Sequence, residues 1–171
     1  MVLYDLEWSN ETYDVKVEIR LRDEGRVHTF PFCIWPRMWA GYKTLAVLNW
    51  QAICFDINNA EAVPDQPGIY AFLIRPNIEV LIGTEYLIYV GKTERTLRQR
   101  FREYIREKNN RFGRAKVVEF LQKYDAHILF TCAIVDGQVK PNLIENELLK
   151  AFMPPANSDF PAEVRRIIPY Q

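Results

Sequence analysis

Alternating hydrophobic and polar residues predict β-structure in the first part of the chain. Apolar side chains fall at every second position from Asp14 to Leu21, and a turn separates this run from another at residues 26–34. An alternation of period two is typical of strands with one buried face. The pattern therefore predicts a β-hairpin, whose second strand lies at a sheet edge because it contains Pro31. Residues 35–50 are rich in aromatic side chains and fit neither period, and residues 50–55 predict another strand.

A stretch rich in proline and turn-forming residues, Asn58 to Pro67, separates two parts of the chain. We place a boundary after residue 62, between an N-terminal extension with the β-hairpin and the aromatic-rich segment (1–62) and a second domain (63–171). Thr93 is expected to cap the first helix of the second domain. The pattern there predicts strands at 68–74 and 85–91, helices at about 94–108 and 114–124, a strand at 126–135 and a helix at about 141–152. This β-β-α-α-β-α order indicates the α+β class, a small antiparallel or mixed sheet flanked by helices.

The composition indicates a globular protein rather than a membrane-spanning or disulfide-stabilised one. Of the 171 residues, 49% are hydrophobic and 26% charged, which suits a compact domain with an extension. No apolar run approaches the roughly 18 residues that a membrane span needs, and the acidic start of the chain is unlike a signal peptide. Cys33, Cys54 and Cys132 are odd in number and lack the spacing of metal ligands. We therefore expect a cytoplasmic protein.

Positive charge is concentrated in one segment of a chain that is neutral overall. Residues 92–116 contain ten Lys or Arg and three Glu, a net charge of +7, and the rest of the chain carries −7. A concentrated basic surface attracts polyanions such as nucleic acid. The alternative is a solvated basic helix that binds no ligand.

One arginine of the helix predicted at 94–108 points away from the others. At about 100° per residue, the apolar side chains gather in a stripe around Leu97 and Tyr104, and most of the arginines form an outer face. Arg100 instead falls beside Tyr104, toward the body of the protein. Either Arg100 has a buried role, or its long side chain snorkels at the edge of the stripe.

The last predicted helix carries an acid among its apolar side chains. Glu145 falls on the same flank as Ile144, Leu148 and Phe152, whereas Glu147 falls on the polar side. A carboxylate in such a place costs several kcal/mol unless a compensating charge lies nearby. That charge is either an arginine or a bound cation such as Mg²⁺, which prefers oxygen ligands.

Six short elements in order resemble the signature of the GIY-YIG nuclease superfamily. Any one of these strings recurs by chance, but six of them at compatible spacings are specific. The resemblance covers about residues 65–160, and residues 1–60 lie outside it. The six elements are Gly68-Ile69-Tyr70, Tyr89-Val90-Gly91, Lys92 directly after it, Leu97-x-x-Arg100-x-x-x-Tyr104, Glu145 and Asn157.

The resemblance implies an endonuclease that depends on a divalent metal and hydrolyses phosphodiester bonds in DNA. It implies that Tyr70 or Tyr89, on adjacent strands, deprotonates or orients the attacking water. We favour Tyr70, with Lys92 or Tyr89 lowering its pKa, because a phenol with a pKa near 10 needs a nearby cation to act as a base at neutral pH. Gly68 and Gly91 are expected to allow close backbone approach.

The resemblance also implies roles for residues on and after the helices. Arg100 holds the scissile phosphate, and Tyr104 contacts or positions the same phosphate. Glu145 anchors one divalent cation, Mg²⁺ or Mn²⁺, and Asn157 supports the site through hydrogen bonds. We expect a group of neighbouring basic residues to bind double-stranded DNA: Arg95, Arg98, Arg102, Arg106, Lys108 and Arg111.

The layout is nearest to the restriction-endonuclease branch of the superfamily. Eighteen residues separate Tyr70 from Tyr89, a longer hairpin than the repair and homing branches have, and about sixty residues precede the module. A restriction or defence nuclease of this size is expected to be a homodimer, because two-fold DNA sites are matched by two-fold proteins. The alternatives are a nucleic-acid-binding module that does not cut, and a repair or RNA-directed nuclease of the same superfamily.

Overall fold

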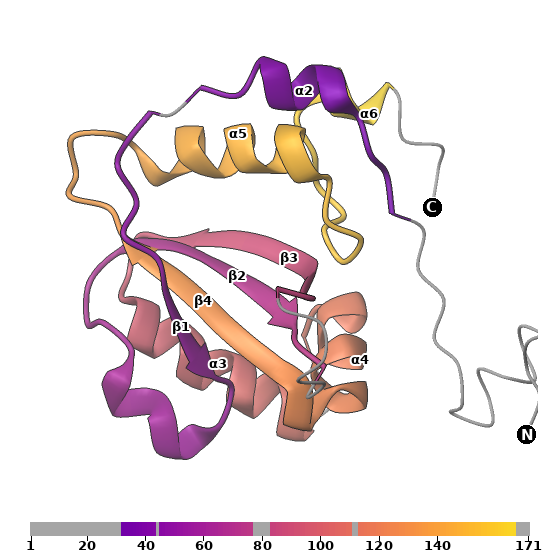
Figure 1. Ribbon diagram of the computed structural model, residues 1–171. Coiled ribbons are helices and arrows are strands. Elements are labelled where there is room, and N and C mark those ends of the chain that lie inside the picture. The colour runs from indigo at the N-terminus through magenta and orange to yellow at the C-terminus, as the bar shows by residue number, and fades with distance from the viewer. Residues whose placement is uncertain (1–31, 44, 77–82, 111–112, 167–171) are drawn as a thin grey trace, which may run out of the picture. The chain divides into compact units, whose positions relative to one another are not determined.

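The structure is a computed structural model that describes residues 32–43, 45–76, 83–110 and 113–166 (Figure 1). Contacts within the chain divide it into two units, Met1–Pro31 and Phe32–Gln171, and all described residues belong to the second unit. The hairpin predicted near the N-terminus falls outside the described ranges, except for residues 32–34, which have no regular secondary structure.

Four strands, β1 (Gln51–Cys54), β2 (Gly68–Ile74), β3 (Tyr86–Thr93) and β4 (Ile128–Ile134), form one sheet. Their order is β1-β4-β2-β3, and each pair of neighbours is antiparallel. β2 lies between β3 and β4, and nearly all of its side chains are buried. The strands predicted in this region are confirmed, and so is the α+β class.

Helices cover both faces of the sheet (Figure 1). α5 (Pro141–Phe152) lies along one face, whereas α3 (Leu97–Asn110) and α4 (Ala115–Lys123) lie along the other. The three long helices predicted from the sequence are confirmed, and none of the helices in the described ranges is long and apolar enough to span a membrane. The shorter helices are α2 (Pro36–Ala40), α6 (Ala162–Arg165) and the 3₁₀ helices η1 (Ile57–Ala62) and η2 (Asp125–His127).

The start of α3 differs from the sequence prediction by three residues. Thr93 is the last residue of β3, where it pairs with Gly68 of β2, so it does not cap the helix. The hydroxyl of Thr96 accepts a hydrogen bond from the backbone N–H of Gln99 at 3.1 Å and takes that role. The strand pairing keeps the backbone extended past the point at which local propensity favoured a helix.

Alternation along β2 sends its side chains into two different cores. Ile69 and Ala71 join an apolar cluster that includes Leu148 of α5. Tyr70 and Phe72 project toward the opposite face, where Phe130 of β4 stacks on Tyr70 with ring centroids 5.3 Å apart. The sheet is therefore buried on both faces, with an aromatic core on the side of α3 and α4.

Residues 32–62, which the sequence pattern placed in an N-terminal extension, belong to the unit that contains the sheet. β1 pairs with β4 from Gln51 opposite Cys132 to Cys54 opposite Leu129.

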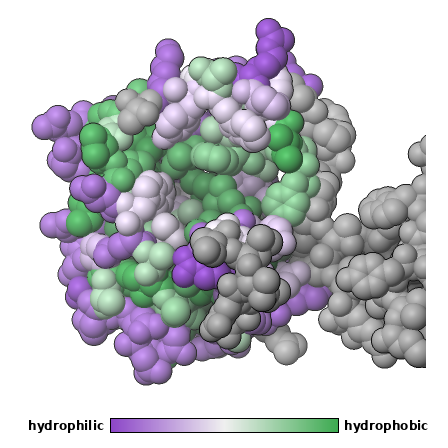
Figure 2. Space-filling model, in the orientation of Figure 1, coloured by the Kyte–Doolittle hydropathy of each residue, from purple (hydrophilic) through white to green (hydrophobic). Residues whose placement is uncertain are grey.

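Figure 2 shows hydrophobic side chains toward the middle of the face seen in Figure 1, with hydrophilic ones around the margin. Several large apolar side chains in or near this segment's aromatic part are exposed: Phe32, Ile34, Trp39, Leu45, Val47 and Trp50.

Candidate active site

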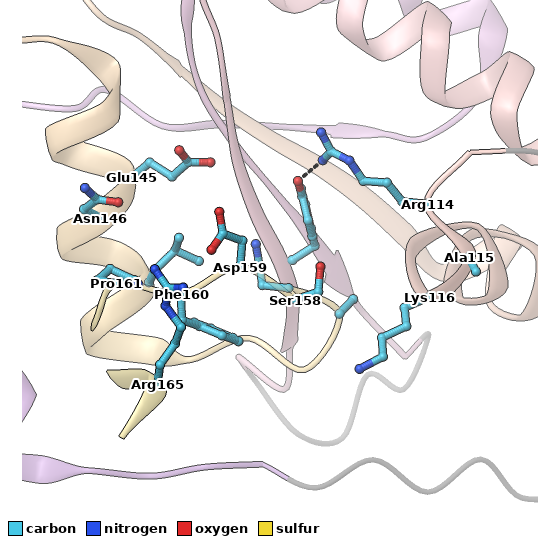
Figure 3. Close-up of a pocket in the computed structure, with 14 residues that line it drawn as sticks. Arg114, Ala115, Lys116, Glu145, Asn146, Ser158, Asp159, Phe160, Pro161 and Arg165 are labelled. Atoms are coloured by element: carbon cyan, nitrogen blue, oxygen red, sulfur yellow. Dashed lines mark hydrogen bonds between the residues drawn. The ribbon is translucent and has the colours of Figure 1, made fainter. Parts of the chain in front are cut away.

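A pocket of about 650 Å³ opens beside the edge strand β3. Its walls come from β3, from the start of α4, from α5, from the loop that follows α5 and from α6 (Figure 3). Two acids, Glu145 and Asp159, and three cations, Arg114, Lys116 and Arg165, are among its lining residues. Glu145 extends from α5 toward the strands on one side, and Arg114 extends toward the same strands from the other side. The pocket thus combines opposite charges with a partly apolar wall.

Glu145 is half-buried in this wall, as its place on the apolar flank of α5 indicated. Burial raises the pKa of its carboxyl above the usual value, although Lys92 and Arg114 act in the opposite direction. No described Lys or Arg lies within ion-pair distance of the carboxylate. Its charge is therefore only partly compensated by the protein, and a bound cation would complete the compensation.

Three tyrosine hydroxyls form a connected group beside the pocket. The hydroxyls of Tyr70 and Tyr104 lie 3.2 Å apart. Nη1 of Arg114 donates to Tyr104 at 3.0 Å and also to Tyr89. Burial raises the pKa of Tyr89 and of Tyr104, so both phenols are protonated at neutral pH.

Of these tyrosines, Tyr89 is the one that lines the pocket. Tyr70, which we favoured as the general base, is 1% exposed, and its hydroxyl lies between Tyr104 and the guanidinium of Arg100. A base must reach the water or substrate whose proton it takes. Of the three tyrosines, the structure therefore places Tyr89 at the pocket, whereas Tyr70 is buried behind it.

Gly91 provides the space that the Tyr70 hydroxyl occupies. A Cβ atom at Gly91 would lie 2.6 Å from both Cζ and Oη of Tyr70 and 2.8 Å from a ring carbon of Tyr89. Gly68 is equally restricted, because a Cβ there would lie 2.2 Å from the carbonyl oxygen of Ala133. The close approach expected at both glycines is present.

We expect Gly91→Ala to lower the free energy of unfolding by about 1–3 kcal/mol, the range typical of overpacking. The Tyr70 ring cannot move aside, because it is fully buried and packed against Phe130. Urea unfolding measures the effect. Gly41→Ala is the matched control, since the nearest atom to a Cβ there is 3.6 Å away. Equal losses in the two variants would contradict the packing argument.

Arg100 is segregated from the other arginines of α3, as predicted, and its side chain is only 12% exposed, which excludes snorkelling. Its Nε donates to the Tyr70 hydroxyl at 3.2 Å, and its guanidinium stacks 4.0 Å from the centre of the Tyr104 ring. Nη1 donates to Glu103 at 2.7 Å and to Glu107 at 3.2 Å. Two carboxylates from its own helix thus neutralise Arg100.

The structure does not bring Arg100 and Glu145 together in one pocket. They belong to helices on opposite faces of the sheet (Figure 1), and Arg100 is absent from the residues that line the pocket. Arg114, rather than Arg100, lines the pocket with Glu145 and acts electrostatically on it. Arg114 precedes α4 with an extended backbone, so helical periodicity gave no way to find it.

The outer basic residues of α3 are mostly paired with acids of the protein. Arg95 makes two hydrogen bonds to Glu103, at 2.6 and 2.9 Å. Arg98 and Arg102 share Glu61, and Lys108 pairs with Asp125 at 2.5 Å. Arg111 lies outside the described residues. Arg106 lines a groove on this outer face together with Arg95 and Arg102.

Asn157 secures the exposed edge of the sheet. Its side-chain amide donates to the carbonyl of Val90 at 2.8 Å and accepts from the Val90 N–H at 3.0 Å. The neighbouring Ala156 N–H donates to the carbonyl of Ile88 at 3.0 Å. These bonds occupy backbone groups of β3 that would otherwise be unpaired, so the pocket has a fixed wall.

Two further charged residues have local partners. Lys92 is half-buried and its Nζ lies 3.3 Å from Glu94. Glu147, the rival to Glu145, lies outside the pocket and pairs with Lys150 at 3.2 Å. Among the described residues no three His, Cys, Asp or Glu side chains gather as a metal-binding group. Any cation at Glu145 would therefore be held by few protein ligands.

Comparison with protein-family models, with curated proteins and with solved structures finds no match to this chain.

Proposed function

We propose that the protein is a metal-dependent endonuclease of the GIY-YIG superfamily that hydrolyses phosphodiester bonds in DNA. One observation carries the proposal: the Glu145 carboxylate and the Tyr89 hydroxyl line one pocket at the edge of β3, together with the basic side chains of Arg114, Lys116 and Arg165. An acid for a cation, a hydroxyl for the reacting oxygens and a basic group for the phosphate are the parts that phosphodiester hydrolysis needs. The motif residues Tyr70 and Gly91 support the proposal because they pack against Tyr89 at the wall of the pocket.

The carboxylate of Glu145 fits a hard divalent cation. Mg²⁺ commonly binds through one or two carboxylates and keeps several waters or substrate oxygens as its other ligands, which suits a pocket with Glu145 and Asp159. Burial disfavours the ionised form of Glu145 and raises the pKa of its carboxyl, and a bound cation would offset that cost. When bound, Mg²⁺ or Mn²⁺ supplies Lewis-acid stabilisation of the charge on the phosphate.

Tyr89 acts in this proposal as a hydrogen-bond donor in the pocket. Its hydroxyl accepts from Arg114, so its own proton is free to point elsewhere. Burial raises its pKa and keeps that proton in place at neutral pH. The hydroxyl therefore orients an oxygen of water or of the phosphate. Tyr70 positions Tyr104 and Arg100 from behind.

Incubation of supercoiled plasmid, phage DNA and an RNA transcript with the purified protein tests the proposal. We expect DNA cleavage in Mg²⁺ or Mn²⁺ and none in EDTA. Discrete fragment ends would support a restriction or defence role, for which a homodimer is proposed, and single nicks would support a repair role. Preferential cutting of the transcript would replace DNA by RNA as the substrate.

A nucleic-acid-binding module would behave differently in the same experiment. It would bind DNA with an affinity that falls with salt, and no strand would be cut under any metal condition. That result, obtained with folded protein, would overturn the proposed nuclease function.

A further inference from the structure

We propose that Arg114, and not Arg100, is the guanidinium that contacts the scissile phosphate. The inference rests on the nuclease function proposed above and names the residue that binds the substrate's phosphate. It follows from three properties in which the two arginines differ: access to the pocket, free hydrogen-bond donors and uncompensated charge.

Arg114 lines the pocket and is exposed overall, whereas the Arg100 side chain is 12% exposed and lines no part of it. Figure 3 shows the Arg114 side chain reaching from the start of α4 to a hydrogen bond at the strands. Lys116 and Arg165 line the same pocket, so a phosphate there would meet several positive charges.

Within the described part of the chain, Arg114 is held in place through one of its three nitrogens. Nη1 donates to the hydroxyls of Tyr89 and Tyr104, and the guanidinium carbon lies 5.5 Å from the centre of the Tyr89 ring. Neither Nε nor Nη2 donates to a described protein atom. A guanidinium presents a planar fork of donors that matches two phosphate oxygens. Two tyrosines therefore orient the fork and leave its other donors for a ligand.

Arg114 also keeps its charge available. No described Asp or Glu lies within ion-pair distance of its guanidinium, whereas Glu103 and Glu107 both bind Arg100. To reach a phosphate, Arg100 would have to give up those two carboxylates and its bond to Tyr70. Arg114 needs no such exchange to contact an anion in the pocket.

The opposite wall of the pocket supports the same arrangement. Glu145 acts electrostatically on Tyr89 and is acted on by Arg114, so the three groups share one local field. A phosphate between Arg114 and a cation at Glu145 would have its charge neutralised from two sides. This is the usual way in which enzymes stabilise phosphoryl-transfer transition states.

Arginine footprinting with phenylglyoxal tests the contact without relying on turnover. Wild-type protein is labelled with and without a 30-base-pair duplex, with Ca²⁺ in place of Mg²⁺, and modified peptides are quantified by mass spectrometry. We expect Arg114 to be labelled in the free protein and protected by DNA. Arg75, 51% exposed and paired with Glu85 outside the pocket, is the internal control and should be labelled equally in both. Equal labelling of Arg114 with and without DNA would overturn the inference.

Single-turnover cleavage provides the second readout. Arg114→Gln should lower the rate about 100-fold, Arg114→Lys should restore part of it by returning the charge, and Arg75→Gln should leave it unchanged. Arg114→Gln cutting at the wild-type rate would overturn the inference while leaving the nuclease function intact. Wild-type protein that never cuts, but whose Arg114 is protected by DNA, would overturn the nuclease function and support the phosphate contact.

Discussion

A Glu145→Gln protein is expected to lose cleavage by about 100-fold or more and yet to unfold at a higher temperature than the wild type at neutral pH. Both effects follow from the same feature, a half-buried carboxylate whose charge the protein compensates only in part. Glutamine keeps the shape of the side chain and removes the charge. The variant therefore loses the cation ligand together with the cost of burying an ionised acid.

The difference in stability between Glu145→Gln and the wild type should become smaller as the pH falls. Burial raises the pKa of Glu145 in the folded state above its value in the unfolded chain, so the folded state binds this proton more tightly. The destabilisation is present above the raised pKa and disappears as pH falls below the unfolded value of about 4.3. In EDTA, the unfolding temperature of Glu145→Gln should therefore be higher than that of the wild type at pH 7.5. The two unfolding temperatures should be equal near the unfolded pKa of about 4.3.

In the presence of a divalent metal, the wild type should unfold at a higher temperature than Glu145→Gln. A ligand that binds only the folded state stabilises it, so Mg²⁺ is expected to raise the unfolding temperature of the wild type and not of Glu145→Gln. Glu147→Gln is the matched control on the same helix, because Glu147 pairs with Lys150 outside the pocket. It should cut at the wild-type rate. Cleavage by Glu145→Gln within a few-fold of wild type would contradict the role given to this acid.

The elements of the sheet and its helices were predictable because their signals are local. The run from Gly68 to Ile74 is apolar and bounded by turn formers, and it forms β2 at the predicted bounds. Pro141 at the start and the two prolines after Phe152 set the bounds of α5. The same periodicity placed Glu145 on the buried flank and Arg100 away from its neighbours, and both placements hold.

The pairing between distant elements could not be predicted in the same way. The strand predicted at residues 50–55 forms β1, but its partner β4 is more than seventy residues away, so nothing local shows that these two strands pair. The acids that bind the arginines of α3 were counted as charge but not located as partners. Glu103 and Glu107 enclose Arg100 because side chains three and seven residues apart on a helix lie on one face.

In the candidate site, too, residues with local sequence signals could be predicted, whereas a residue defined by distant contacts could not. Tyr89 and Asn157 belong to motifs and were found from the sequence, whereas Arg114 lies between two helices, where neither a period nor a motif selects one basic residue from its neighbours. Its importance comes from contacts with Tyr89 and Tyr104, which are 25 and 10 residues away in the chain. A helical-wheel argument ranks residues within an element and cannot rank those that join elements.

Arg100→Ala is expected to lower the free energy of unfolding by about 3 kcal/mol, because it leaves two half-buried carboxylates without their shared cation. The side chains of Glu103 and Glu107 are 18% and 15% exposed, and one oxygen of Glu107 already lacks a partner among the described residues. Arg102→Ala is the control on the same helix. Its ion pair with Glu61 is largely exposed, at 46% and 73%, and such pairs contribute about 0–1 kcal/mol. Urea unfolding at pH 7 separates the two, and equal losses would contradict the buried network.

At low pH, the difference in the free energy of unfolding between the wild type and Arg100→Ala should disappear. Burial alone would raise the pKa of Glu103, but its hydrogen bonds to Arg95 and Arg100 lower it below the usual value. A carboxyl with a lowered folded-state pKa contributes stability that is present above its unfolded pKa and is lost as pH falls through the folded one. The difference in the free energy of unfolding between the two proteins should therefore be largest at pH 7 and should decrease below about pH 4. A gap that stayed constant over this range would mean that Arg100 stabilises the fold by packing on Tyr104 rather than by its charge.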